Sequence, residues 1–331
     1  EELPDLTPGK GEILIDVKAS GVNFPDILTV QGKYQFKPPL PFVPGTEVSG
    51  IVTQIGEGVT RHAVGDKVIG TLPIGAFAEQ CVTSEYTAFG MGKSMSFEQA
   101  AGFAVTYGTS YYALKQRANI QPGETLLVLG AAGGVGIATI QIAKAMGAKV
   151  IAAASTDEKC ALCRSIGADE TINYSTDNLR EAIKTLTGGK GPDVIYDPVG
   201  GEFAEPAFRS IAWRGRLLVV GFAAGRIPTL AANHVLIKTY SVIGVRAGEW
   251  LRRRPAEAPA IRARGVTRRF GAVTAVVDVD AIKRVGIERE VVRTAVGVLQ
   301  RLVVGDQGNV VAAAGFIASE HVEIGAIHLG R

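Results

Sequence analysis

The chain has 331 residues, of which 47% are hydrophobic and 20% are charged, and its formal net charge is +3. This length and apolar content suit two ordinary domains with sizeable cores. No uninterrupted apolar run approaches the roughly 20 residues that a bilayer crossing needs, and the first residues lack the order of a secretory signal. We therefore expect a cytoplasmic protein with no membrane association.

The excess positive charge is concentrated in one stretch. Residues 246–269 hold eight Arg against Glu249 and Glu257, so the rest of the chain is net negative. Trp250 is the one aromatic residue among these arginines, so the regular aromatic interleaving of a nucleic-acid interface is missing and a solvated surface is favoured. The three cysteines are Cys81, Cys160 and Cys163, and they are too few for a disulfide framework. The CxxC pair lacks the partner cysteines of a zinc site, so we expect simple packing.

The first part of the chain is patterned as short strands. Between residues 11 and 90, apolar segments such as EILIDVKASGVN, EVSGIVTQIG and DKVIGTL are broken by Gly and Pro. In the first of these, the apolar residues Ile13, Ile15, Val17 and Ala19 recur at every second position, which is typical of a strand. The pattern predicts a barrel-like β domain.

From about residue 125 the pattern changes to alternating strands and helices. The strands are TLLVLG, KVIAAAS, ETINYS, DVIYDPV, RLLVVGF and YSVIGV, and the segment GVGIATIQIAKAMGA between the first two has the character of a helix. Six strands with intervening helices predict an α/β fold with a doubly wound parallel sheet.

A glycine-rich loop joins the first of these strands to its helix. Residues 131–136, AAGGVG, fit the pattern Ala-x-Gly-x-x-Gly directly after a strand and directly before a helix. In that context Gly133 lets the backbone approach a pyrophosphate, Gly136 lets helix and strand pack closely, and the helix amino terminus favours the anion. The expected cofactor-binding residues here are Ala132, Gly133, Gly134, Val135 and Gly136.

The end of the next strand indicates which dinucleotide is bound. An NAD site commonly places Asp or Glu there to bind the ribose hydroxyls, whereas this chain has Ala154 and Ser155, with Lys159 one helical turn later. A hydroxyl and a cation suit a 2′-phosphate, so we expect NADPH. A helix start capped by Ser155 or Thr156, with Lys159 in solvent, is equally compatible with these residues.

Several ordered motifs together resemble one family. GVNFPDILTVQGKY, PFVPGTEVSGIV, AAGFAVTYGTSYYAL, LVLGAAGGVG, GADETINY, IYDPVGG, RLLVVGF and SVIGVRAG are similar to the zinc-independent quinone oxidoreductases, the zeta-crystallin-like group of the medium-chain dehydrogenase/reductase superfamily. The resemblance runs from about residue 2 to 258. It implies a GroES-like catalytic domain, residues 1–108 and 246–331, and a Rossmann domain, residues 109–245, with the cofactor in the cleft between them. We also expect a homodimer.

The resemblance also assigns individual residues. Zinc-containing relatives carry ligands where this chain has Asn23, Thr46 and Val105, so no metal is expected. By the family pattern, Ser155, Lys159 and Tyr174 would surround the 2′-phosphate, while Asn23 and Tyr34 would line the substrate cleft. The residues expected to border the nicotinamide are Thr109, Val199, Gly221 and Phe222. An Asn after a strand and a Tyr near Gly and Pro also have ordinary structural uses.

These expectations define a function and its rivals. The favoured activity is hydride transfer from NADPH to a quinone or an α,β-unsaturated carbonyl, with Asn23, Tyr34 and Thr109 as the catalytic candidates. One alternative is an enoyl-thioester reductase on the same fold, whose acyl-CoA phosphates the arginine-rich stretch could bind. Another is an NADPH-binding protein without turnover. After about residue 259 the family pattern is no longer recognisable, so the late barrel strands are not predicted.

Overall fold

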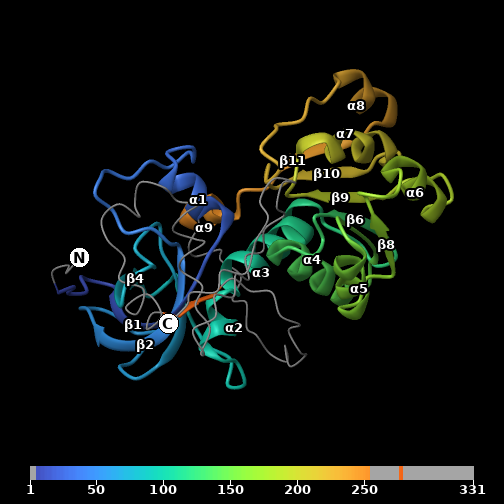
Figure 1. Ribbon diagram of the computed structural model, residues 1–331. Coiled ribbons are helices and arrows are strands. Elements are labelled where there is room, and N and C mark those ends of the chain that lie inside the picture. Colours follow the sequence, from blue (N-terminus) through green and yellow to red (C-terminus); the bar gives the residue numbers. More distant parts are fainter. Residues whose placement is uncertain (1–4, 254–275, 279–331) are drawn as a thin grey trace, which may run out of the picture. The chain divides into compact units, whose positions relative to one another are not determined.

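The computed structural model describes residues 5–253 and 276–278 (Figure 1). These residues divide into two compact units, one holding residues 5–105, 253 and 276–278 and the other holding residues 106–252. Within the described residues, no helix is long and apolar enough to cross a membrane.

The first unit is built on an antiparallel sheet. Its strands run in the order β12-β1-β2-β3-β5, and β4 also pairs with β1. The alternating pattern read in the sequence produces this sheet, because Ile13, Ile15 and Val17 point into one core with Val48 and Val68. The strands are β1 (Glu12–Gly21), β2 (Glu47–Ile55), β3 (Lys67–Thr71), β4 (Gln80–Ser84), β5 (Ala88–Gly90) and β12 (Val276–Asp278).

One strand of this sheet was not predicted. Strand β12 pairs antiparallel with the end of β1, from Ala19 opposite Asp278 to Gly21 opposite Val276. It lies in a segment that carries no recognisable family pattern, so only its pairing with β1 reveals it. Two short helices, α1 (Phe24–Val30) and α2 (Phe97–Ala101), complete the described part of this unit.

The second unit confirms the predicted doubly wound α/β fold. Its six parallel strands run in the order β11-β10-β9-β6-β7-β8, so the chain reverses direction across the sheet between β6 and β9. The strands are β6 (Thr125–Leu129), β7 (Lys149–Ala154), β8 (Glu170–Asn173), β9 (Val194–Asp197), β10 (Arg216–Val219) and β11 (Ser241–Gly244). Ligands bind such sheets where the strand order reverses, at the carboxyl ends of the strands.

Both faces of this sheet are covered by helices. In β6, Leu126 and Val128 face one core with residues of α4, whereas Leu127 and Leu129 face the other with residues of α6 and α7. Strands buried on both faces explain the continuous apolar runs in the sequence. The helices are α3 (Ala104–Tyr111), extended by a π-helical turn (Tyr112–Arg117), α4 (Gly134–Ala145), α5 (Asp157–Ser165), α6 (Leu179–Leu186), α7 (Gly201–Ser210), α8 (Ala232–Lys238) and α9 (Ala247–Arg253).

The CxxC pair of α5 packs inside the second unit, as expected. Cys160 is 3% exposed and Cys163 is fully buried. Burial raises the pKa of the Cys163 thiol to about 12 and also raises that of Cys160. Both thiols therefore stay protonated and act as small apolar side chains.

Candidate active site

The glycine-rich loop leads from the end of β6 into α4. Gly130 has a positive φ of 59°, and Gly133 N donates to Gly130 O at 3.0 Å, which closes the turn. A Cβ atom at Gly136 would lie 2.5 Å from Ala131 O and 2.6 Å from Gly130 O, so this position has no room for a side chain. Gly136 therefore has the packing role that the sequence predicted.

A small pocket opens beside this loop. Its lining residues are Gly130, Ala132, Gly133, Ala154, Ser155, Lys159 and Tyr174. The structure thus brings together five of the residues that the sequence singled out for cofactor binding. No carboxylate is among these lining residues, and the ammonium group of Lys159 donates to Ser155 Oγ at 2.9 Å.

Local hydrogen bonds explain why Ser155 and Lys159 face each other. Thr156 caps α5 by accepting from Lys159 N at 3.3 Å, so the cap does not use the Ser155 hydroxyl. The carboxylate of Asp157 accepts from Asn173 Nδ2 at 2.8 Å, which holds this nearby acid in a hydrogen bond of its own. The arrangement leaves a hydroxyl and a cation at the pocket.

Tyr174 forms one wall of this pocket. It follows β8 and stacks on Phe203 with 4.2 Å between ring centroids, and only 9% of it is exposed. Burial raises the pKa of its phenol above the ordinary value, although a hydrogen bond with Ser155 acts in the opposite direction. The hydroxyl therefore remains protonated near neutral pH and can donate to an anion.

Three of the residues expected to border the nicotinamide, Val199, Gly221 and Phe222, follow the carboxyl ends of β9 and β10. The buried carboxyl group of Asp197 accepts from Val199 N at 2.9 Å and from Gly200 N at 2.8 Å, while Gly221 N donates to Asp197 O at 3.3 Å. Phe222 borders Gly200, because a Cβ atom there would lie 3.0 Å from Phe222 Cδ1. Asp197 thus organises this loop, a role that the sequence analysis missed. Thr109 lies half-buried in α3.

In the first unit, Asn23 belongs to a buried polar cluster. Asn23 precedes α1, and its Nδ2 donates to Glu47 Oε1 at 2.9 Å, while its backbone N donates to Asp26 Oδ2 at 2.7 Å. Thr46 Oγ1 donates to Asp26 Oδ1 at 3.2 Å, and Val105 N donates to Glu47 Oε2 at 2.9 Å. The cluster therefore includes Asn23, Thr46 and Val105, the three positions that the family resemblance aligns with the ligands of zinc-containing members.

The two carboxyl groups of this cluster, those of Asp26 and Glu47, are buried and have raised pKa values. Asp26 is 3% exposed and Glu47 is 1% exposed. Burial raises the pKa of Asp26 to about 7 and that of Glu47 to about 8, against the opposing effect of their hydrogen bonds. Neither residue was predicted from the sequence as part of the site, although the three-residue spacing of Asn23 and Asp26 is that of a helix cap. Within the described residues, no group of three or more His, Cys, Asp or Glu is arranged to hold a metal ion.

Tyr34 lies in the loop after α1 and is half-buried. Tyr34 N donates to Leu28 O at 3.1 Å, which fastens the loop to the helix, and Gly32 supplies a positive φ of 67° for the turn. The Tyr34 hydroxyl takes no part in the hydrogen bonds of the Asn23 cluster described above.

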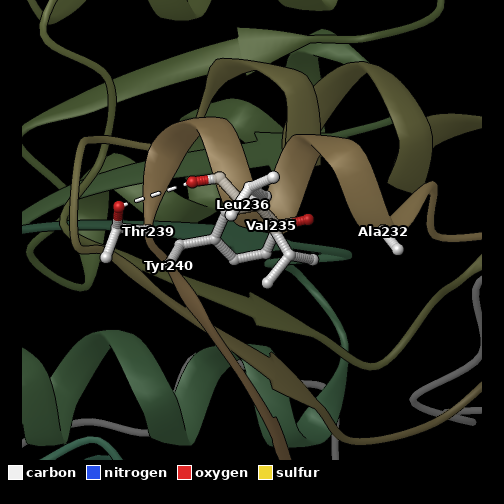
Figure 2. Close-up of a pocket in the computed structure, with 5 residues that line it drawn as sticks. All are labelled: Ala232, Val235, Leu236, Thr239 and Tyr240. Atoms are coloured by element: carbon white, nitrogen blue, oxygen red, sulfur yellow. Dashed lines mark hydrogen bonds between the residues drawn. The ribbon is translucent and has the colours of Figure 1, made fainter.

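A second hollow lies along α8 and shares no residue with the first (Figure 2). It is lined by Ala232, Val235, Leu236, Thr239 and Tyr240, and in the close-up the Tyr240 ring lies beneath the helix. No charged side chain lines it, so its chemistry does not match that of a phosphate site.

Comparison with known proteins identifies the family. Residues 9–123 match the alcohol dehydrogenase GroES-like domain, and residues 134–262 match the domain described as zinc-binding dehydrogenase. Quinone oxidoreductase-like protein 2 of Mus musculus is 45% identical over 251 residues, which cover 76% of this chain and 72% of the relative.

Solved structures agree with this assignment. The Escherichia coli quinone oxidoreductase complexed with NADPH is 32% identical with a TM-score of 0.71, over 78% of this chain and 80% of that one. The CurK enoyl reductase is 31% identical with a TM-score of 0.69, over 77% and 79% of the two chains. The chain therefore belongs to the quinone oxidoreductases of the medium-chain dehydrogenase/reductase superfamily and is an enzyme of the quinone oxidoreductase type.

Proposed function

We propose that the enzyme uses NADPH to reduce a quinone or another α,β-unsaturated carbonyl compound without zinc. The observation that carries the choice of cofactor is the pocket at the end of β7, where Lys159 and Ser155 meet 2.9 Å apart and no carboxylate is among the lining residues. A ribose 2′-phosphate is a dianion that such a pair can bind with charge-assisted hydrogen bonds, whereas a carboxylate would repel it.

The rest of the second unit fits the same cofactor. The pyrophosphate would bind at Gly133 and Gly134, where α4 begins and its backbone N–H groups are available. The loop that Asp197 organises would hold the nicotinamide against Val199, Gly221 and Phe222. When bound, NADPH supplies a hydride ion to the acceptor, and solvent supplies the proton that completes the reduction.

The catalytic candidates carry only neutral groups, an amide in Asn23 and hydroxyls in Tyr34 and Thr109. An amide and hydroxyls are weak at stabilising the localised alkoxide that forms when an isolated carbonyl accepts a hydride. A quinone or an enone spreads the added electrons over a conjugated system, so modest hydrogen bonding suffices. This chemistry favours conjugated acceptors over simple ketones and aldehydes.

A turnover screen tests this proposal. The purified enzyme is given NADPH with a panel of quinones, enals and enoyl-thioesters, and NADPH oxidation is followed. We expect turnover with at least one quinone or enone and a much smaller rate with NADH. Absence of turnover across the panel, or a preference for NADH, would count against the proposal.

The second candidate is an enoyl-thioester reductase, favoured by the likeness to the CurK enoyl reductase. The sequence analysis offered the arginine-rich stretch as a site for acyl-CoA phosphates, but most of that stretch lies outside the described residues. Of its described arginines, Arg246 and Arg252 are already paired with Glu249, at 3.9 Å and 2.7 Å. The same screen decides, because this candidate requires an enoyl-CoA to be turned over faster than any quinone.

We also propose that the enzyme is a homodimer joined through β11. In the described part of the chain β11 pairs only with β10, so its other backbone edge is open. The strand, SVIG, carries neither Lys nor Pro to prevent pairing. Val242 on the strand is 43% exposed, and the preceding helix exposes 79% of Leu236 and 68% of Ile237. Two copies of such an edge can pair antiparallel about a two-fold axis.

Oligomeric state is measured by sedimentation or by light scattering. We expect a dimer for the natural chain and a monomer for the Val242→Lys and Ile237→Lys double variant, because the buried ammonium groups would oppose pairing. Leu186→Lys is the control, since Leu186 is exposed on α6, at a distance along the sheet from β11. A monomeric natural chain, or a double variant that still dimerises, would contradict this interface.

A further inference from the structure

Glu47 is held in a tight space in the first unit. It begins β2, and only 1% of its surface is exposed. Its carboxyl group packs against Gly21, where an added Cβ atom would collide with both Glu47 Oε1 and the backbone oxygen of Ala101. Gly21 therefore provides the room that the carboxyl group occupies, and the surroundings allow that group little freedom to move.

Both oxygens of Glu47 accept hydrogen bonds. Oε1 accepts from Asn23 Nδ2, and Oε2 accepts from Val105 N, each at 2.9 Å. A carboxamide has a donor end and an acceptor end, whereas an ionised carboxylate only accepts. The bond to Glu47 therefore directs Nδ2 of Asn23 toward the carboxyl group and leaves Oδ1 on the other side of the amide. Asp26 fixes the backbone of the same residue, at 2.7 Å from Asn23 N.

An acidic residue at this position is unfavourable for stability alone. Burial raises the pKa of Glu47 to about 8, and the neighbouring Asp26 raises it further. A buried amide or apolar side chain would avoid the cost of removing a charge from water. The property that an ionised carboxyl group has and these alternatives lack is two equivalent acceptors on one rigid plane. The structure places a donor at each oxygen, and Glu47 offers both acceptors once it is ionised, above its pKa of about 8.

We propose that Glu47 is a positioning residue for the reductase reaction, fixing which end of the Asn23 carboxamide is presented to the electron acceptor. This inference rests on the proposed function, in which Asn23 contacts the acceptor. Glu47 itself acts through Asn23.

The test is the isosteric substitution Glu47→Gln. Val105 N is a fixed backbone donor, so the single carbonyl oxygen of Gln is expected to accept from it and the Gln NH2 group to face Asn23. The carboxamide of Asn23 then turns over or loses its partner. Measured above the pKa of about 8, where Glu47 is ionised, kcat/KM for the acceptor should fall about ten-fold, the effect of one lost hydrogen bond to a charged group, with the KM for NADPH unchanged.

Glu85→Gln is the matched control. Glu85 is also buried in the first unit, but it accepts from the backbone N–H groups of Thr60 and Arg61, each at 2.9 Å. The control should change the unfolding midpoint and leave the acceptor kinetics unaltered. If Glu47→Gln does not fold, Glu47→Asp replaces it, because the shorter side chain keeps the charge but draws the carboxylate away from Asn23.

A double-mutant cycle separates positioning from a structural role. If Glu47 acts through Asn23, then Asn23→Ala lowers kcat/KM for the acceptor, and adding Glu47→Gln to it causes no further loss. Losses that multiply in the double variant, or a Glu47→Gln enzyme as active as the natural one, would overturn the inference while leaving the proposed function standing. An Asn23→Ala enzyme with unchanged acceptor kinetics would overturn the inference together with the placement of Asn23 in the acceptor site.

Discussion

At the scale of single residues, Lys159 and Ser155 at the end of β7 are the residues that we propose select NADPH over NADH. We predict that Lys159→Ala raises the dissociation constant for NADPH about ten- to hundred-fold, the equivalent of about 1.5–3 kcal/mol for a lost charged hydrogen bond. The affinity for NADH should hardly change, because NADH has no 2′-phosphate. Titration of both cofactors measures this.

The control for Lys159 is another lysine of the same unit. Lys184 in α6 lies 3.9 Å from Glu181 and is largely exposed, so Lys184→Ala should leave both affinities as they are. An equal loss of NADPH and NADH affinity in Lys159→Ala, or no loss, would show that Lys159 does not bind the 2′-phosphate.

Glu47 gives a second prediction, on stability and pH. Its pKa is about 8 in the folded protein and 4.5 ordinarily, so between these values the unfolded chain releases a proton that the folded protein retains. Glu47 therefore lowers stability progressively as pH rises from about 4.5 to about 8. Asp26, whose pKa is also raised, lowers stability with rising pH in the same way. It is present both in the natural protein and in a Glu47→Gln variant, so a comparison of the two isolates the contribution of Glu47.

The glutamine side chain of a Glu47→Gln variant cannot ionise, so the variant lacks the loss of stability that Glu47 causes as pH rises. We expect the urea midpoint of the variant to rise relative to that of the natural protein as pH increases across the same window. Midpoints at pH 5 and pH 8 measure the difference. A difference that is the same at both pH values, or that falls with pH, would be inconsistent with a raised pKa for Glu47.

The sequence predicted part of the site but not the residues that support it. Ser155, Lys159 and Gly136 follow from local position alone, because each stands at a fixed distance from a strand end or a helix start. Glu47 could not be found in this way, because its contact with Asn23 depends on how the chain folds over 24 residues and on burial of an acid, which composition rules argue against. Asp26 stands at helix-cap spacing from Asn23, but its burial is not visible in the sequence.

At the scale of elements, the loop between β6 and α4 makes two glycines necessary for different reasons. We predict that Gly136→Val destabilises the protein by about 1–3 kcal/mol or more, because its Cβ would lie 2.5 Å from Ala131 O. Gly133 has φ of −77°, which any residue adopts. Gly133→Val should therefore fold normally and fail to bind NADPH, since its side chain blocks the pyrophosphate.

Thermal unfolding and NADPH titration on both variants separate the two roles. A folded Gly133→Val protein with normal NADPH affinity would show that the phosphates bind elsewhere. A Gly136→Val protein as stable as the natural one would contradict the packing role of Gly136.

The elements themselves were predictable where the pattern was strong. Most of the six strands of the second unit were recognised because they contain continuous apolar runs between turn residues, and burial on both sheet faces requires such runs. Strand β8, ETIN, is the exception, with Ile172 as its one apolar residue. Strand β12 was not recognised, because three residues contain no periodicity and only its pairing with β1 defines it.

At the scale of the whole molecule, we predict an enzyme that works without zinc. The family resemblance aligns Asn23, Thr46 and Val105 with the ligands of zinc-containing members, and none of these side chains is a usual zinc ligand. Elemental analysis of the dialysed protein should find no stoichiometric zinc, and a chelator should leave activity unchanged. Zinc retained at one ion per chain, with activity lost to a chelator, would refute this.

The most direct test of the central claim compares a conjugated acceptor with its saturated counterpart. Initial rates of NADPH oxidation are measured with a cyclic enone and with the matching saturated ketone, at equal concentrations. We predict turnover of the enone at least about 100-fold faster, a difference of about 2.7 kcal/mol in activation free energy, because the neutral side chains of Asn23, Tyr34 and Thr109 are weak at stabilising a localised alkoxide. Comparable rates with the two substrates, or reduction of the ketone alone, would contradict it.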